Sequence, residues 1–147
     1  MKTAKDLISG QELAVVSRNQ TVLEAAKLMA EKRIGAVPVV EESRVVGIFS
    51  ERDIMTRVVA KNLNPQNTLV EQVMTKDLIV GSPEEEIEQI MKRMQAGNIR
   101  HLPIVSGETL IGILSLRDLL QADLDEKGEE IKIMTANIHY IPPTFES

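Results

Sequence analysis

Apolar residues follow two spacings along the chain, one typical of strands and one typical of helices. A short apolar run at Leu13–Val16 predicts a strand. Apolar residues then recur at the spacing of an amphipathic helix, at Val22, Ala25, Ala26 and Met29. Two valine-rich runs that are typical of strands follow at Ala36–Val40 and Val45–Phe49. A second helix is expected through Ile54–Ala60, which makes the predicted order β-α-β-β-α.

The same order of elements occurs a second time, 65 residues later and without a gap. Between residues 13–53 and 78–118, 13 of 41 aligned positions are identical. The predicted elements of the second copy are Leu78–Val80, a helix with Ile87, Ile90, Met91 and Met94, the strands His101–Val105 and Leu110–Leu114, and a helix through Leu119–Ala122. A unit of this length is too small for a large core, so the two units are expected to pack on each other.

Capping motifs predict where the helices begin. Ser17 to Gln20 and Ser82 to Glu85 both fit the capping box, in which a serine and a glutamate or glutamine three residues later satisfy the first helical N–H groups. Pro83 then falls at the first helical position, where proline is tolerated. Gly97 is expected to end the first helix of the second unit in a left-handed conformation.

These patterns divide the chain into four segments. Unit 1 with the N-terminal segment spans residues 1–62, and a polar linker that leads into unit 2 spans 63–77. Unit 2 spans 78–122, and an acidic C-terminal extension spans 123–147. Asp123–Glu130 is expected to be solvated, and the rest of the extension, in which Pro142-Pro143 prevents a continuous helix, is expected to add an edge strand or clasp a partner. The predicted fold class is therefore α+β, with two small units in one pseudo-two-fold module.

Composition excludes several classes of function. The absence of cysteine rules out disulfides, thiolate metal sites and a cysteine nucleophile, and two histidines are too few for a multi-histidine metal centre. A net charge of −5 and 2% aromatic residues argue against nucleic acid or an anionic membrane as a partner. No apolar stretch has the length of a membrane span and no signal peptide is evident, so we expect a cytoplasmic protein.

The segment Ser50-Glu51-Arg52-Asp53 and its copy Ser115-Leu116-Arg117-Asp118 carry the candidate chemistry. Each serine lies where a strand ends and a helix begins, and a helix N-terminus favours phosphate. Each aspartate can accept two hydrogen bonds from a ribose diol. The alternative interpretation is that Ser50 and Ser115 are simple helix caps and that each aspartate completes its first turn.

Two in-register copies of apolar-x-x-x-Pro-apolar-apolar followed by Gly-Ile-x-Ser-x-Arg-Asp resemble the cystathionine-β-synthase-type domain, or CBS domain. The resemblance covers residues 3–122 and implies a stand-alone pair of units packed sheet to sheet. It further implies two clefts between the units that bind adenine nucleotides, and a dimer of modules. Asp53 and Asp118 inherit the role of ribose ligands and are expected to be exposed in the empty clefts. Ser50 and Ser115 inherit contacts to ribose or phosphate.

Basic residues that the resemblance places against phosphate differ between the two units. Unit 2 has Arg100, His101 and Arg117. Unit 1 has Arg52 at the position of Arg117, but Gly35 and Ala36 at the positions of Arg100 and His101, and Arg33 lies further from the strand. We therefore expect the cleft with Asp118 to bind AMP or a longer phosphate chain more tightly than the cleft with Asp53. Surface positions for Arg52 and Arg117, and an ordinary strand position for His101, are the alternatives.

An apolar slot for adenine is implied on the first strand of each unit and on the strand that carries the proline. The candidates for the slot are Ala14, Val15, Val16, Ile34, Ala36 and Val37 in unit 1, and Ile79, Val80, Ile99 and Leu102 in unit 2. Gly35, Pro38 and Pro103 belong to the same candidate ligand-binding set. Side chains alternate across a strand, so about half of these residues are expected to be plain core.

These observations favour a regulatory module that senses an adenosine compound and signals to another protein by a change of shape. AMP, ADP, ATP and NAD(H) all carry the diol, as does S-adenosylmethionine, so the ligand stays open. No nucleophile with a base and no set of metal ligands is evident, so no enzyme, catalytic residue or metal is predicted. An oligomerisation scaffold with empty sites is the alternative. Apolar residues on helices favour a homodimer, and they are Met29, Met55, Met91, Met94 and Leu119.

Overall fold

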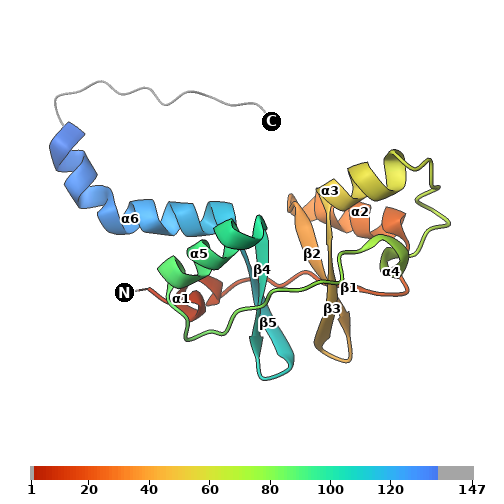
Figure 1. Ribbon diagram of the computed structural model, residues 1–147, viewed down its shortest axis with the longest axis horizontal. Helices are drawn as coiled ribbons and strands as arrows, with labels where there is room; N and C mark the ends of the chain where they lie inside the picture. Colours follow the sequence, from red (N-terminus) through yellow and green to blue (C-terminus); the bar gives the residue numbers. More distant parts are fainter. Residues whose placement is uncertain (1, 136–147) are drawn as a thin grey trace.

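The computed structural model describes the backbone of residues 2–135 and the side chains of residues 2–126. Two β-hairpins lie side by side, and each is accompanied by its own helices (Figure 1). The first half contains β1 (Val16–Ser17), α2 (Val22–Lys32), β2 (Ala36–Glu41), β3 (Arg44–Ser50), α3 (Glu51–Asp53), the π-helical segment η1 (Ile54–Val59) and α4 (Val70–Val73). The second half contains α5 (Ile87–Gly97), β4 (His101–Ser106), β5 (Thr109–Ser115) and α6 (Leu116–Thr135), and α1 (Ala4–Ile8) precedes both. The α+β class and both predicted hairpins are confirmed.

The two hairpins have the same register. Pro38 pairs with Ile48 in β2–β3, and Pro103 pairs with Ile113 in β4–β5. The strand order is β1-β2-β3-β5-β4, and the hairpins join through a single residue pair, Arg44 with Thr109. This narrow junction leaves the other ends of the hairpins free to enclose space between the units.

The first strand of each unit is shorter than predicted. Leu13–Val16 is expected to be a strand, but only Val16 and Ser17 pair with β2. In the second unit, Leu78–Val80 forms no strand, and the pairing is reduced to a bridge between Gly81 and Ile104. Residues 13–15 and 78–80, which precede these pairs, therefore form no strand of the sheet.

The predicted starts of α2 and α5 are wrong by several residues. Ser17 and Gln20 form a turn, closed by the Ser17 N–H donating to Gln20 Oε1 at 2.8 Å, and α2 begins at Val22 with Thr21 as its cap. Ser82 donates to Glu85 Oε1 at 2.9 Å in the same way, so Pro83 lies in a turn before α5. The left-handed residue after α5 is Asn98, with φ of 52°, and not Gly97.

Each unit has its own buried core, and each core includes a helix from across the expected boundary. Val70, Val73 and Met74, within the expected linker, pack in the cluster of the first unit. Ala4 and Ile8 of α1 pack in the cluster of the second unit. The two units therefore exchange their short N-terminal helices, and the segment between them is more than a polar linker.

The first part of the C-terminal extension continues a helix of the second unit. Residues Asp123 to Glu130, which are expected to be solvated, belong to α6, which ends at Thr135, and the side chains of Leu124, Asp125 and Glu126 are exposed. The expected edge strand or clasp and Pro142-Pro143 lie outside the described residues. Across the described part of the chain, no helix combines the length and the hydropathy that crossing a bilayer requires.

Candidate functional site

Two clefts lie between the units and are related by the same 65-residue offset as the repeats. The Asp53 cleft, with a volume of about 230 Å³, is lined by Ser50 and Asp53 from the first unit and by Ile79 and Ile99 from the second. The Asp118 cleft, with a volume of about 770 Å³, is lined by Ser115 and Asp118 from the second unit and by Arg33 and Ile34 from the first. Each cleft therefore draws its aspartate from one unit and its apolar wall from the other.

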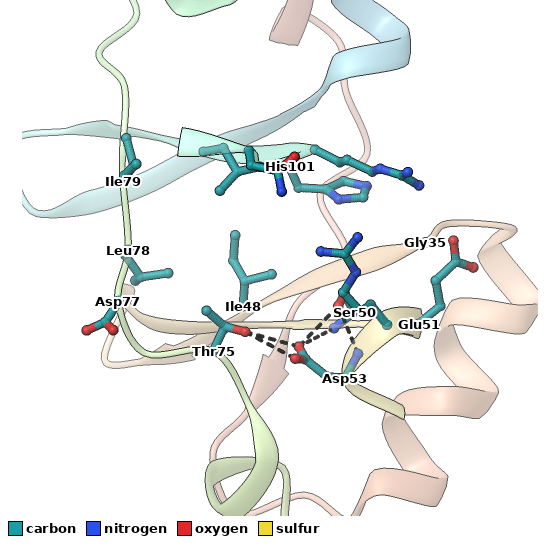
Figure 2. A pocket seen from close by; sticks show the side chains of 14 residues that line it. Gly35, Ile48, Ser50, Glu51, Asp53, Thr75, Asp77, Leu78, Ile79 and His101 are labelled. Carbon is teal, nitrogen blue, oxygen red and sulfur yellow. Dashed lines mark hydrogen bonds between the residues drawn. The ribbon is translucent and has the colours of Figure 1, made fainter. Parts of the chain in front are cut away.

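Asp53 is buried, with only 4% of its surface exposed. Its carboxylate accepts hydrogen bonds from the Ser50 N–H at 3.0 Å and the Ser50 hydroxyl at 3.1 Å. The Thr75 hydroxyl donates to the same carboxylate at 3.1 Å (Figure 2). The expectation that Asp53 is exposed in the empty cleft is wrong, because residues far along the chain cover it.

Arg57 is a further partner of Asp53 and lies close to it in the sequence. Its Nε lies 3.6 Å from Asp53 Oδ1, one turn away on η1. Its Nη1 donates to the carbonyl oxygens of Val73 at 3.2 Å and Met74 at 2.8 Å, at the end of α4. Arg57 and Thr75 therefore tie Asp53 to the segment that joins the two units.

Asp118 has a much simpler environment. Its carboxylate accepts a hydrogen bond from the Ser115 N–H at 3.2 Å, and its own N–H donates to the Ser115 hydroxyl at 3.0 Å. The residues that correspond to Thr75 and Arg57 are Gly10 and Ala122, which carry no hydroxyl or guanidinium. Asp118 is exposed, so most of its acceptor positions face solvent in the cleft.

Ser50 and Ser115 both cap helices, as the simpler interpretation of the motif predicts. Ser50 Oγ accepts from the Asp53 N–H at 3.2 Å, and Ser115 repeats this contact with Asp118. Each side chain also lines its cleft. The caps hold each aspartate against the first helical turn, and the two interpretations of the motif are compatible.

The candidate arginines converge on the clefts. Arg52 lines the Asp53 cleft, Arg33 and Arg117 line the Asp118 cleft, and Arg100 lines both. Within residues 2–126, none of the four forms an ion pair with a carboxylate. Guanidinium groups without a carboxylate partner in a cleft are suited to phosphate oxygens.

Four residues form a wall that the two clefts share: Gly35, Glu51, Arg100 and His101. Glu51 was not a candidate from the sequence, and its N–H donates to the Gly35 carbonyl at 2.9 Å. Burial lowers the pKa of His101 below its usual value, although the carboxylates of Glu51 and Asp118 raise it and Arg100 lowers it. The imidazole is therefore mainly neutral at neutral pH and contributes hydrogen bonds rather than charge.

The apolar candidates divide between the clefts and the core. Ile79 and Ile99 line the Asp53 cleft, and Ile34 and Ala36 line the Asp118 cleft. Val16, Val37 and Leu102 are fully buried in the two cores. Neither of the two clefts includes Ala14, Val15, Val80, Pro38 or Pro103 in its described lining. Because side chains alternate along a strand, only part of the candidate set can face a cleft.

Sequence reasoning did not identify three polar residues that shape the clefts, which are Thr75, Gln11 and Asp77. Thr75 donates its N–H to the Ile48 carbonyl at 2.8 Å and accepts the Ile48 N–H at 2.9 Å. In the second unit, the side-chain amide of Gln11 makes the same two bonds with Ile113, at 2.9 and 3.1 Å. Asp77 also lines the Asp53 cleft. The offset alignment places Gly10 opposite Thr75, and this mismatch was the available clue.

The clefts thus combine an apolar wall, a carboxylate and arginines, which suits a ligand with an apolar ring, a diol and an anionic group. Among the described residues, no group of three or more histidine, cysteine or acidic side chains is placed to hold a metal ion.

Comparisons with known proteins agree with this fold. The model of the CBS domain matches residues 4–60 and 70–125. A CBS domain-containing protein, YhcV of Bacillus subtilis, is 39% identical over 142 residues, which cover 95% of this chain and all of the relative. The crystal structure of the CBS-domain containing protein ATU1752 from Agrobacterium tumefaciens is 30% identical with a TM-score of 0.76, covering 83% of this chain and 99% of that one.

A more distant solved structure shares the fold. The CBS domain pair of protein MJ0100, in complex with 5′-methylthioadenosine and S-adenosyl-L-methionine, has a TM-score of 0.74 and 24% identity, covering 86% of this chain and 99% of that one. Two matched repeats, relatives that align along nearly the whole chain and a shared architecture together lead to one conclusion: this chain belongs to the CBS domain family.

Proposed function

We propose that this protein is a regulatory module that binds an adenine nucleotide, with the Asp118 cleft as its main site. The observation that carries the proposal is the exposed Asp118 carboxylate, which faces a cleft of about 770 Å³ lined by Arg33, Arg100 and Arg117. The carboxylate accepts the ribose diol, and the arginines neutralise the phosphate. AMP, ADP, ATP and NAD(H) all carry both groups.

The adenosine part of the ligand has separate support. Protein MJ0100, which shares the fold, was solved with two adenosine compounds. Ile34 and Ala36 provide the Asp118 cleft with an apolar surface on which adenine can pack. An apolar wall with a few convergent polar groups is the usual composition of a small-molecule site.

Signalling to a partner follows from the position of the cleft. Arg33 and Ile34 belong to the first unit, whereas Ser115 and Asp118 belong to the second. A ligand that contacts both units favours the arrangement in which they are closest, because binding shifts a population toward the state with the better contacts. The regulated protein would recognise this arrangement.

Asp118→Asn is expected to weaken AMP binding tenfold or more, because charge-assisted hydrogen bonds to the diol, worth about 1.5–3 kcal/mol, are lost. Isothermal titration calorimetry measures the effect. The matched control is Glu88→Gln, which removes one negative charge at an exposed residue of α5 that lies outside both clefts. Equal AMP affinities for wild type and Asp118→Asn would reject the site.

We also propose that the protein is a homodimer. Three of the five residues first chosen for the interface are unsuitable, because Met29, Met94 and Leu119 are buried. Other helical residues remain exposed in pairs that obey the repeat offset. Met55 and Leu120 are 60% and 45% exposed, and Val59 and Leu124 are 63% and 53% exposed. Two equivalent apolar helix faces favour a second copy of the chain as the occupant.

The dimer is expected to sediment at about twice the chain mass of 16.3 kDa. Met55→Glu combined with Val59→Glu, at two exposed residues outside both clefts, should shift the species to the monomer mass, because two charges would be buried in the interface. Val15→Glu, at another exposed apolar residue away from these helices, should leave the dimer intact. A wild-type monomer at micromolar concentration contradicts the proposal, and a dimer that binds no nucleotide would favour the alternative function of a scaffold.

A further inference from the structure

A separate cavity lies where α1, β5 and α6 meet, and it shares Asp118 with the larger cleft. Its volume is about 250 Å³. Leu7, Leu114 and Ala122 provide apolar walls, and Asp118 and Asp125 provide carboxylates. Arginine and lysine bury their aliphatic stems against apolar surface and keep the charged head on a polar partner. The composition of the cavity is therefore suited to a cationic head group on an aliphatic stem.

The first unit contains such a group beside the equivalent aspartate. Arg57, four residues after Asp53, places its Nε 3.6 Å from Asp53 Oδ1. Its Nη1 donates to the carbonyl oxygens of Val73 at 3.2 Å and Met74 at 2.8 Å, at the end of α4. A guanidinium thus connects the aspartate of the motif with the short helix that packs in the same core.

The second unit has the same two elements without this cation. Helix α1 is the counterpart of α4, because the repeat offset relates the two helices and each packs in the core of one unit. The residues one turn after Asp118 on α6 are Gln121 and Ala122, and neither carries a charge. Within residues 2–126, Asp118 and Asp125 form no ion pair. The cavity therefore lies between the counterparts of the two elements that Arg57 connects.

Lys2 is the cation among the residues that line the cavity. Its side chain is exposed, and its ammonium makes no ion pair with any carboxylate of the described chain. An ammonium is a compact point charge, whereas a guanidinium is planar and can donate to two acceptors at once, as Arg57 does. Lys2 is therefore a competitor for the carboxylates rather than an equivalent of Arg57.

We propose that this cavity binds a guanidinium group, supplied as an arginine side chain by the protein that the module regulates. The site itself does not depend on the nucleotide, whereas the source of the arginine rests on the proposed function. Asp125 and Glu126 are exposed and extend the acidic surface from the cavity along α6, which favours a basic segment of a protein. Binding in the cavity and in the cleft is then coupled, because both ligands contact the Asp118 carboxylate.

Two blocked amino acids test the site: N-acetyl-L-arginine amide and N-acetyl-L-citrulline amide, which have nearly the same shape and differ in the charge of the head group. Methyl NMR with labelled leucine and alanine reports binding at Leu7, Leu114 and Ala122. We expect the arginine compound to bind there at least about tenfold more tightly than the citrulline compound. Added salt should reduce the difference.

Three variants assign the binding to the cavity. Asp118→Asn and Asp125→Asn each remove one carboxylate of the lining, and each should weaken the arginine compound by about threefold to tenfold. Lys2→Gln removes the competing cation and should strengthen binding. Glu88→Gln, at an exposed residue of α5 outside the cavity, is the matched control for the loss of one charge and should leave the affinity unchanged.

The outcomes separate this site from the proposed function. If the arginine compound binds in the cavity but AMP binds nowhere, the site stands and the proposed function fails. If both blocked compounds bind equally, or neither shifts the methyl groups of the cavity, the site is overturned whether or not AMP binds. If Glu88→Gln weakens binding as much as Asp125→Asn, net charge explains the effect and the assignment to the cavity is overturned. Tighter binding of free L-arginine than of the blocked compound would overturn a protein as the source.

Discussion

Asp53→Ala is expected to lower the free energy of unfolding by about 2–3 kcal/mol, because a buried carboxylate and its hydrogen bonds are removed together. Asp53 is 4% exposed and accepts bonds from the Ser50 N–H and the Thr75 hydroxyl. These donors, and the guanidinium of Arg57, would lose their acceptor. Urea denaturation followed by circular dichroism measures the loss.

Asp118→Ala is the matched control, since the same residue type in the same motif is exposed and has only its contacts with Ser115. Loss of this cap should cost less than about 1 kcal/mol. Equal destabilisation by the two substitutions would show that Thr75 and Arg57 add nothing to the stability of Asp53. The comparison also explains why Asp118, rather than Asp53, is the residue to substitute in a binding experiment.

Gly112→Ala is expected to destabilise the protein by about 1–3 kcal/mol through overpacking. A Cβ atom at residue 112 would lie 2.7 Å from Ile8 Cγ2 and 2.8 Å from Ile8 Cβ, which is fixed to the backbone of α1. Helix α1 must therefore move away from β5. Thermal and urea unfolding measure the change.

A double-mutant cycle with Ile8→Ala distinguishes this clash from other effects of the substitution. Gly112→Ala should cost less when Ile8 is already alanine, with a coupling of about 1 kcal/mol. Gly97→Ala is the control, because its Cβ would meet only the end of the Ile79 side chain at 3.0 Å and alanine favours helix. Additive effects of Gly112→Ala and Ile8→Ala would contradict the close packing of α1 on β5.

The four hairpin strands and the caps at Ser50 and Ser115 could be predicted from the sequence because their signals are local. Valine-rich runs define β2 and β3, and Ser50 caps the helix that follows, as predicted. The repeat then predicts the same elements in the second half. Local propensity and internal repetition therefore account for most of the fold.

The helix starts could not be predicted because distant backbone groups decide them. Two successive capping boxes are available before α2, Ser17 with Gln20 and Thr21 with Glu24, and the structure uses the second for the helix. The Val22 N–H donates to the Thr68 carbonyl at 2.8 Å, and the Leu23 N–H donates to the Pro65 carbonyl at 3.1 Å. The acceptors lie more than forty residues away in the sequence, so no local pattern indicates which box begins the helix.

Contacts between residues distant in the sequence also limit the prediction of the site. The arginines and the two aspartates were identified, but the unequal environments of the aspartates depend on Thr75 and Arg57. Thr75 lies 22 residues from Asp53 and reaches it only because α4 packs in the core of the first unit. A motif specifies the residue type, whereas the fold decides whether its oxygens are free.

The exchange of α1 and α4 between the cores has a consequence for the origin of the protein. A single repeat, cut at the boundary in the sequence, would carry its own short helix but lack the one that closes its core. Two such chains can both be completed by trading that helix, which makes a domain-swapped homodimer the simplest folded ancestor. Joining the two repeats in one chain makes this association intramolecular, so that it no longer depends on concentration.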